Sequence, residues 1–81
     1  MKKYVYCAIF TQTDEGVAVE FPDIFGGVTC GEDFDDAVFM AKDLLRLMLS
    51  TAPAQCESPL SKEEMEKMFP GEKIVEIEVE I

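Results

Sequence analysis

Apolar residues follow two different periods along this chain, and the change of period falls in one glycine-rich stretch. They alternate over residues 3–11, 17–21 and 73–81, which predicts strands. They recur every three or four residues over 34–50, which predicts a helix. The stretch over 21–32, with the sequence FPDIFGGVTCGE, joins the two patterns. Its proline, aspartate and glycines predict a turn, a short third strand and the start of the helix.

The first predicted strand is apolar on both of its faces. Its alternating sets are Tyr4, Tyr6, Ala8 and Phe10 on one face and Val5, Cys7 and Ile9 on the other. A strand of this kind is expected in the centre of a sheet. A polar turn over 12–16 connects it to the second strand, and a third strand around 28–30 completes an antiparallel meander.

The predicted helix has a capped start and one broad apolar face. Asp33 is a good N-cap, and Pro53 is expected to end the helix near Ser50. The face that we expect to cover the sheet consists of Phe34, Ala37, Val38, Ala41, Leu44, Leu45, Met48 and Leu49. Phe39 lies outside this face, in a polar stripe with Asp43. It is either a single exposed aromatic residue or a contact with a partner.

A connector over 51–59 leads from this helix to a second, shorter one over 61–69. Ser61 and Glu64 have the spacing of a capping box, and the Pro70-Gly71 pair stops the helix. Its apolar residues fall on one side: Met65, Met68 and Phe69. We expect this helix to form a small lid on the sheet.

The last strand, over 73–81, has the most regular alternation in the sequence. Its inward side chains are expected to be Val75, Ile77, Val79 and Ile81, and its outward ones Glu76, Glu78 and Glu80. A right-handed crossover from the long helix would place this strand parallel to an earlier strand, at the sheet edge. Glutamates at an edge either prevent sheets from aggregating or form a site for a basic protein.

Composition adds a strongly acidic character to this small domain. The 81 residues carry a net charge of −10, which disfavours direct contact with nucleic acid and favours a basic partner. We expect one domain over 1–81, small enough that self-association would help to stabilise it. Cys7, Cys30 and Cys56 have no metal-ligand spacing, and no signal peptide or membrane-spanning run is evident. These features predict a reduced, cytoplasmic setting without membrane contact.

The sequence does not indicate catalytic chemistry. The chain has no histidine, which removes histidine-based triads and the common zinc sites. It also has no phosphate-binding glycine motif. A two-metal nuclease needs carboxylates on a central strand, and residues 4–10 contain none. We therefore expect a binding role, with no enzyme activity, no metal and no cofactor.

Several spaced residues follow the pattern of a known family. The hairpin contributes Asp14, Glu15, Gly16 and Val17, and the start of the helix contributes Asp35, Asp36 and Ala37. Between them lies a set that we name the motif loop: Phe21, Pro22, Asp23, Gly26, Thr29 and Gly31. Together these residues resemble the N-terminal domain of the HicB family, the antitoxin half of bacterial and archaeal toxin–antitoxin pairs. Phe25 and Gly27 depart from the family pattern, in which proline and cysteine are usual.

The resemblance implies a partial ribonuclease-H-like fold in which a fourth strand lies beside the first. It also implies self-association and inhibition of a HicA-type toxin, a small basic mRNA interferase. The C-terminal DNA-binding segment that such antitoxins commonly carry is not expected, because the chain stops at Ile81. The residues expected at the partner surface are Phe39, Asp43, Glu76, Glu78 and Glu80. The alternative is a stand-alone, homo-oligomeric HicB-like protein that binds a small ligand or another protein and has no toxin partner.

Overall fold

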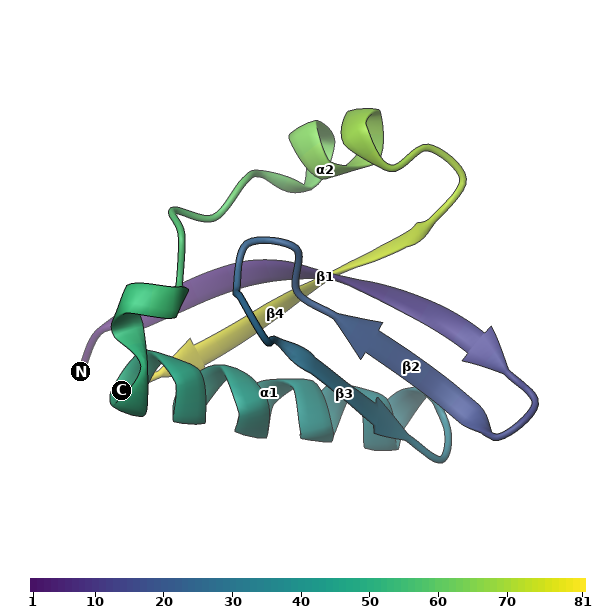
Figure 1. The fold of residues 1–81 in the computed structure, drawn as a ribbon, viewed down its shortest axis with the longest axis horizontal. Coiled ribbons are helices and arrows are strands. Elements are labelled where there is room, and N and C mark those ends of the chain that lie inside the picture. Colours follow the sequence, from purple (N-terminus) through teal and green to yellow (C-terminus); the bar gives the residue numbers. More distant parts are fainter.

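Four strands and two helices form an α+β fold in the computed structural model, which describes residues 1–81. The strands are β1 (Lys3–Thr13), β2 (Gly16–Glu20), β3 (Val28–Gly31) and β4 (Lys73–Glu80). The helices are α1 (Phe34–Thr51) and α2 (Lys62–Met68), with a short 3-10 turn at Pro53–Gln55. One antiparallel sheet, in the order β3-β2-β1-β4, lies between the two helices (Figure 1). The predicted class and order of elements are confirmed.

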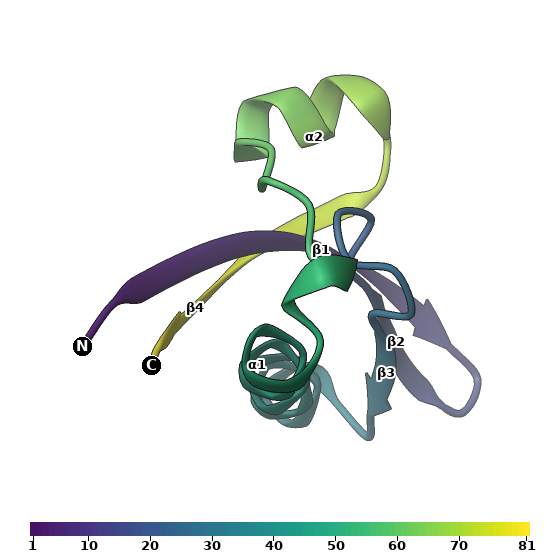
Figure 2. The same ribbon diagram turned by 60° about the vertical axis from the view of Figure 1, so that its left-hand side comes forward.

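β1 lies inside the sheet and buries both of its faces over residues 6–10, as predicted, whereas Val5 is 37% exposed. On one side the main core contains Tyr6, Ala8, Phe10, Val17, Val19, Phe21, Ile24, Ala37, Ala41, Leu45, Ile77 and Val79. On the other side a smaller core contains Cys7, Ile9, Met65 and Ile74. Figure 2 shows α1 and α2 on opposite sides of the sheet. We name these two sides the α1 face and the α2 face.

β4 is an edge strand, as predicted, but it pairs antiparallel with β1, so the expected parallel direction is wrong. The reason is the path of residues 52–72, which include most of the connector and α2. After β3, α1 returns along one face, and the connector with α2 then travels back along the opposite face before β4 begins (Figure 1). A single helical crossover gives a parallel strand, and this second passage along the sheet reverses the direction.

α1 begins with a reciprocal cap at the predicted N-cap residue. The Asp36 N–H donates to Asp33 Oδ1, and the Glu32 N–H donates to Asp36 Oδ2, both at 2.8 Å. Three residues of the predicted core face are fully buried: Ala37, Ala41 and Leu45. The cap and this face together fix where the helix starts and which side it turns toward the sheet.

The first turn of α1 differs from the prediction at Phe34, which was expected in the core and is 43% exposed. Its ring centroid lies 5.4 Å from that of Phe10 and 4.9 Å from the Lys73 ammonium. A cation therefore covers the outer side of this ring. Gly31 allows the close approach of this end of the helix to β3, because a Cβ at that position would collide with the backbone of Ala37.

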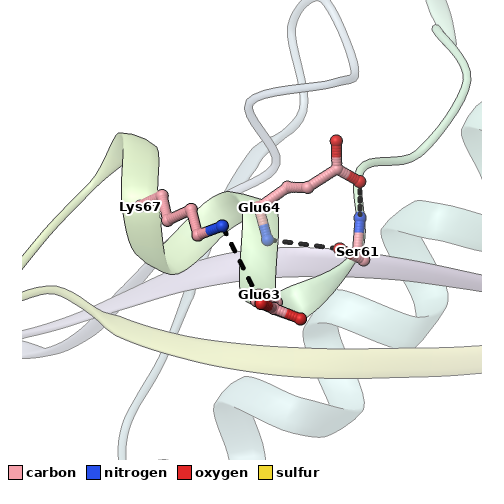
Figure 3. Close-up of polar contacts among 4 residues, drawn as sticks. All are labelled: Ser61, Glu63, Glu64 and Lys67. Atoms are coloured by element: carbon pink, nitrogen blue, oxygen red, sulfur yellow. Dashed lines mark hydrogen bonds and ion pairs between the residues drawn. The ribbon is translucent and has the colours of Figure 1, made fainter.

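α2 is the predicted lid, and the predicted capping box forms at its start (Figure 3). The Glu64 N–H donates to the Ser61 hydroxyl, and the Ser61 N–H donates to the Glu64 carboxylate, both at 3.2 Å. An ion pair of 3.8 Å joins Lys67 to Glu63 one turn apart. This exposed pair adds little to stability, whereas the cap satisfies backbone groups that the helix leaves free.

The apolar side of α2 is narrower than predicted. Met65 is fully buried against the sheet, but Met68, expected on the same side, is 60% exposed. The helix ends at Met68, and the following residue, Phe69, packs against the smaller core in its place. The lid is therefore held by Met65, Phe69 and the half-buried Leu60 before the helix.

Burial of Cys7 under this lid makes the stability of the fold sensitive to alkaline pH. Burial raises the pKa of the Cys7 thiol above its ordinary value of 9.0, and the charge of Glu76 raises it further. The unfolded chain consequently releases the thiol proton at a lower pH than the folded chain. The stabilising contribution is complete below the ordinary value of 9.0 and is lost as the pH rises through the folded pKa.

We expect the free energy of unfolding, measured by urea denaturation, to fall as the pH is raised from about 8 to about 11. The Cys7→Ala variant removes the buried thiol and should show a flatter decline. Cys30→Ala, which removes an exposed thiol, should retain the decline of the unmodified protein. Equal declines in the Cys7→Ala variant and the unmodified protein would contradict this account of the buried thiol.

Candidate protein-binding surface

The three glutamates of β4 lie exposed on the α2 face of the sheet. Their neighbours along the strand, Val75, Ile77 and Val79, pack toward α1 in the main core. Successive side chains of a strand point to opposite faces, so Glu76, Glu78 and Glu80 point to the side away from α1. α2 and the smaller core cover only the beginning of β4, at Ile74. The predicted alternation is confirmed over residues 75–80, but Ile81, expected to face inward, follows the end of β4 and is 44% exposed. The alternation leaves an open row of carboxylates that we name the glutamate row.

Phe39 and Asp43 lie on the outer side of α1. Phe39 is 65% exposed, and Leu47, two turns further along the helix, is 55% exposed. Because α1 covers the α1 face and the glutamate row lies on the α2 face, the sheet separates the two groups (Figure 2). The five residues expected at a partner surface therefore form two surfaces on opposite sides of the molecule.

Two positively charged side chains lie near the glutamate row, Lys3 of β1 and Arg46 of α1. Lys3 on β1 lies 3.8 Å from Glu78, and both side chains are exposed, so this pair contributes little binding energy of its own. Glu76 and Glu80 form no ion pair. In a chain of net charge −10, the row adds to a negative potential that attracts cationic groups.

The free edge of β4 also presents backbone hydrogen-bonding groups. Lys2 and Ile81 exchange two backbone hydrogen bonds, of 2.8 and 2.9 Å, which fixes the alternation of bonded and non-bonded pairs along the β1–β4 ladder. By this alternation Val79 and Ile77 bond to β1. The N–H and C=O groups of the glutamate row point away from β1, toward solvent. The same three residues therefore carry both the carboxylates and the unpaired backbone groups.

A shallow depression of about 400 Å³ runs along the end of this edge. It is lined by residues 78–80 of β4, by Met1 and by Arg46 of α1. The helical pattern of the sequence places Arg46 in the polar stripe of α1 and gives no sign that it borders β4. The depression shows that the edge is open to solvent between the sheet and the helix.

The motif loop has a structural role where the chain passes from β2 to β3, on the other side of β1 from β4. Phe21 is buried, and its N–H donates to the Gly27 carbonyl at 2.8 Å, which closes the loop before β3. Pro22 is half-buried, and Gly26 has a φ of 80°, a left-handed conformation that suits glycine. Thr29 lies on β3 opposite Val19, and Gly31 supports α1 as described above.

Asp23 of the motif loop holds the connector that leads to α2. Its carboxylate accepts a hydrogen bond from the Leu60 N–H at 3.1 Å, and its carbonyl accepts one from the Glu57 N–H at 2.7 Å. The Tyr6 hydroxyl donates to the Glu57 carbonyl at 2.9 Å, and Ile24 forms an isolated bridge with Cys56. These contacts hold the connector against the motif loop and β1, and we name this set of contacts the clamp.

We expect the Asp23→Ala variant to lose about 1–2 kcal/mol of stability, because the half-buried Leu60 N–H loses a charged acceptor. The exchange of the Leu60 amide hydrogen, followed by NMR, should become faster, and limited proteolysis should cut near residues 57–60. Asp23→Asn keeps a side-chain oxygen at the same position and is the matched control. Unchanged Leu60 exchange in Asp23→Ala would show that the clamp does not depend on this carboxylate.

The described residues contain no group of three or more cysteine, aspartate or glutamate side chains placed to hold a metal ion. No helix has both the length and the apolar character needed to cross a membrane. The fold and its surfaces thus define a small acidic α+β protein with one open, carboxylate-bearing sheet edge. No protein family model matches the chain, and no similar curated protein or solved structure was found.

Proposed function

We propose that this protein is a HicB-like antitoxin, or a binding module derived from one, that neutralises a basic HicA-type mRNA interferase by covering its surface. The observation that carries the proposal is the glutamate row on the open edge of β4, in a chain of net charge −10. In this role the protein binds and has no catalytic activity or cofactor of its own. The free state of all three cysteines fits the cytoplasm as its setting.

The charge argument follows from what an RNA-cleaving partner requires. A protein that binds RNA needs cationic side chains to neutralise phosphates, and that surface is positively charged. An acidic protein that occupies it competes directly with RNA. Opposite charges also accelerate association and favour the correct orientation of the two proteins. The glutamate row supplies the acidic surface for this competition, because Glu76 and Glu80 are exposed and form no ion pair.

The arrangement of elements supports the same proposal through the resemblance in the sequence. That resemblance implies a fourth strand beside the first, and β4 pairs with β1 along its whole length. It also depends on the motif loop, which here closes the turn before β3 and clamps the connector. The matched residues therefore have coherent structural roles in this chain.

A second candidate is a stand-alone, homo-oligomeric protein that binds a small ligand or another protein and has no toxin partner. The exposed apolar residues on the outer side of α1, Phe39 and Leu47, favour it. A contact between two copies through this side would remove both from water without involving the glutamate row.

The test is a pull-down of the tagged protein from lysate of its native cell at low and at high salt. We expect a small basic protein to be captured and to elute as the salt concentration rises, since exposed charge pairs are screened. The purified partner should cleave RNA alone and lose this activity when the tagged protein is added in equal amount. Recovery of only further copies of the same chain, or of a partner without RNA-cleaving activity, would favour the second candidate.

A further inference from the structure

We propose that the free edge of β4 receives an added strand from the partner, and that this strand carries basic side chains at every second position. The inference rests on the proposed function for the basic character of the partner, and it specifies how that partner binds. It combines three features of one edge: unpaired backbone groups, alternating carboxylates and the lack of any covering element.

The backbone of the edge sets the geometry of the added strand. The N–H and C=O groups of Glu76, Glu78 and Glu80 point away from β1, and none of them takes part in the turn, loop or cap hydrogen bonds of the protein. An extended segment can pair with these groups and extend the sheet to a fifth strand. These backbone hydrogen bonds contribute affinity that does not depend on the side chains of the partner segment.

The side chains of the edge select which segment binds. A strand placed beside β4 turns alternate side chains toward the α2 face, next to the glutamate row. Directly opposed side chains on neighbouring strands lie close enough for charge pairs to stabilise the sheet. Lysine or arginine at these positions therefore pairs with the carboxylates.

The other side chains of the added strand meet different surroundings. They turn toward the α1 side of the edge, where Val79, Met1 and Arg46 line the depression together with Glu78 and Glu80. The Arg46 guanidinium repels a cation there, and Val79 and Met1 offer apolar contact. The partner segment is accordingly one in which basic and uncharged, apolar residues alternate.

The same charges exclude a second copy of this chain from the edge. Antiparallel pairing of two β4 edges about Glu78 would place Glu78 beside its own copy, and Glu76 beside Glu80, on one face. Directly opposed like charges destabilise a strand pair. The glutamate row thus disfavours pairing with a second copy and favours pairing with a basic strand. Prevention of sheet aggregation and binding of a basic protein, the two roles considered for edge glutamates, therefore follow from the same charges.

The first experiment uses short acetylated peptides as probes and NMR-detected amide exchange as the measurement. A peptide that alternates lysine and valine should bind and slow the exchange of the Glu76, Glu78 and Glu80 amide hydrogens. The Ile77 and Val79 amides, already bonded to β1, should change little and serve as internal controls. A peptide of the same composition with its lysines and valines in separate blocks should bind more weakly and give no such pattern.

A pair of variants at one position separates backbone pairing from charge. The Glu78 N–H faces away from β1, so Glu78→Pro removes a donor of the free edge without removing a bond of the β1–β4 ladder. We expect Glu78→Pro to bind the alternating peptide about tenfold more weakly than Glu78→Gln, which loses the same charge and keeps the donor. Glu63→Gln on α2 is the control for a lost charge elsewhere. Circular dichroism establishes that each variant is folded.

The outcomes distinguish this inference from the proposed function. Equal binding by Glu78→Pro and Glu78→Gln, or no alternating protection of the glutamate amides in the unmodified protein, would overturn strand addition. If the pull-down nevertheless yields a basic ribonuclease, the proposed function stands and the partner binds in another way. If the peptide gives the alternating protection and no ribonuclease is captured, strand addition stands and the proposed function fails.

Discussion

Replacing Leu45 with alanine is expected to lower the free energy of unfolding by about 2–5 kcal/mol. Leu45 is fully buried in the middle of α1, and its side chain belongs to the main core between helix and sheet. Its truncation removes apolar contacts and leaves a cavity that the surrounding strands cannot close completely. For 81 residues the total stability expected of a domain is about 4–12 kcal/mol, so this one substitution removes a large part of it.

Urea denaturation followed by circular dichroism measures this effect, and Leu47→Ala is the matched control. Leu47 is the same residue type on the same helix, but it is 55% exposed on the outer side. Its replacement should change the stability by less than about 0.5 kcal/mol. Similar losses in the two variants would mean that α1 turns a different side toward the sheet, or that a second copy covers Leu47.

Reversing the charge of Glu76, Glu78 and Glu80 to lysine is expected to weaken the complex with a basic partner by at least about tenfold. Each change replaces an attraction by a repulsion of similar size, and the three changes act on one continuous edge. The affinity that remains should depend less on salt concentration. Because all three side chains are exposed, the protein should stay folded, which a thermal melt can establish.

The control for this triple variant changes the same amount of charge at other exposed positions: Glu15, Glu66 and Glu72 to lysine. Calorimetric titration of the captured partner against both variants provides the comparison. A loss of affinity confined to the β4 variant places the interface at the glutamate row. Equal losses in both variants would mean that only the overall charge of −10 attracts the partner. Unchanged affinity in both would place the contact elsewhere, for example at Phe39.

Most of the fold could be predicted from the sequence because the apolar residues of each strand and helix recur with a regular period, and because capping and turn residues mark where the elements begin and end. The alternation in β1 and β4, the Asp33 cap and the Ser61 capping box are local signals, and each of them appears in the structure. The direction of β4 could not be predicted from such signals. It depends on the path of residues 52–72, and contacts between residues far apart in the sequence, such as the hydrogen bond that the Glu57 N–H donates to the Asp23 carbonyl, determine that path.

The candidate surface was predictable only in part for a similar reason. The alternation in β4 predicts that its glutamates are exposed, which is confirmed. It does not predict that they lie on the side of the sheet opposite to Phe39 and Asp43, since that depends on how α1 and β4 are placed in three dimensions. To predict which backbone groups of the β4 edge are unpaired, one must know the register between β1 and β4, and the pattern of side chains in the sequence does not give that register.

The two ends of the chain lie side by side at one corner of the sheet, as both ribbon views show (Figures 1 and 2). Lys2 and Ile81 hold them together through two backbone hydrogen bonds, so a short flexible linker can join one terminus to the other. The exposed turn at Asp14 and Glu15 offers a new place to open the chain. We expect a circularly permuted protein that begins there to retain every strand pairing and both cores, with the present termini joined in an exposed loop.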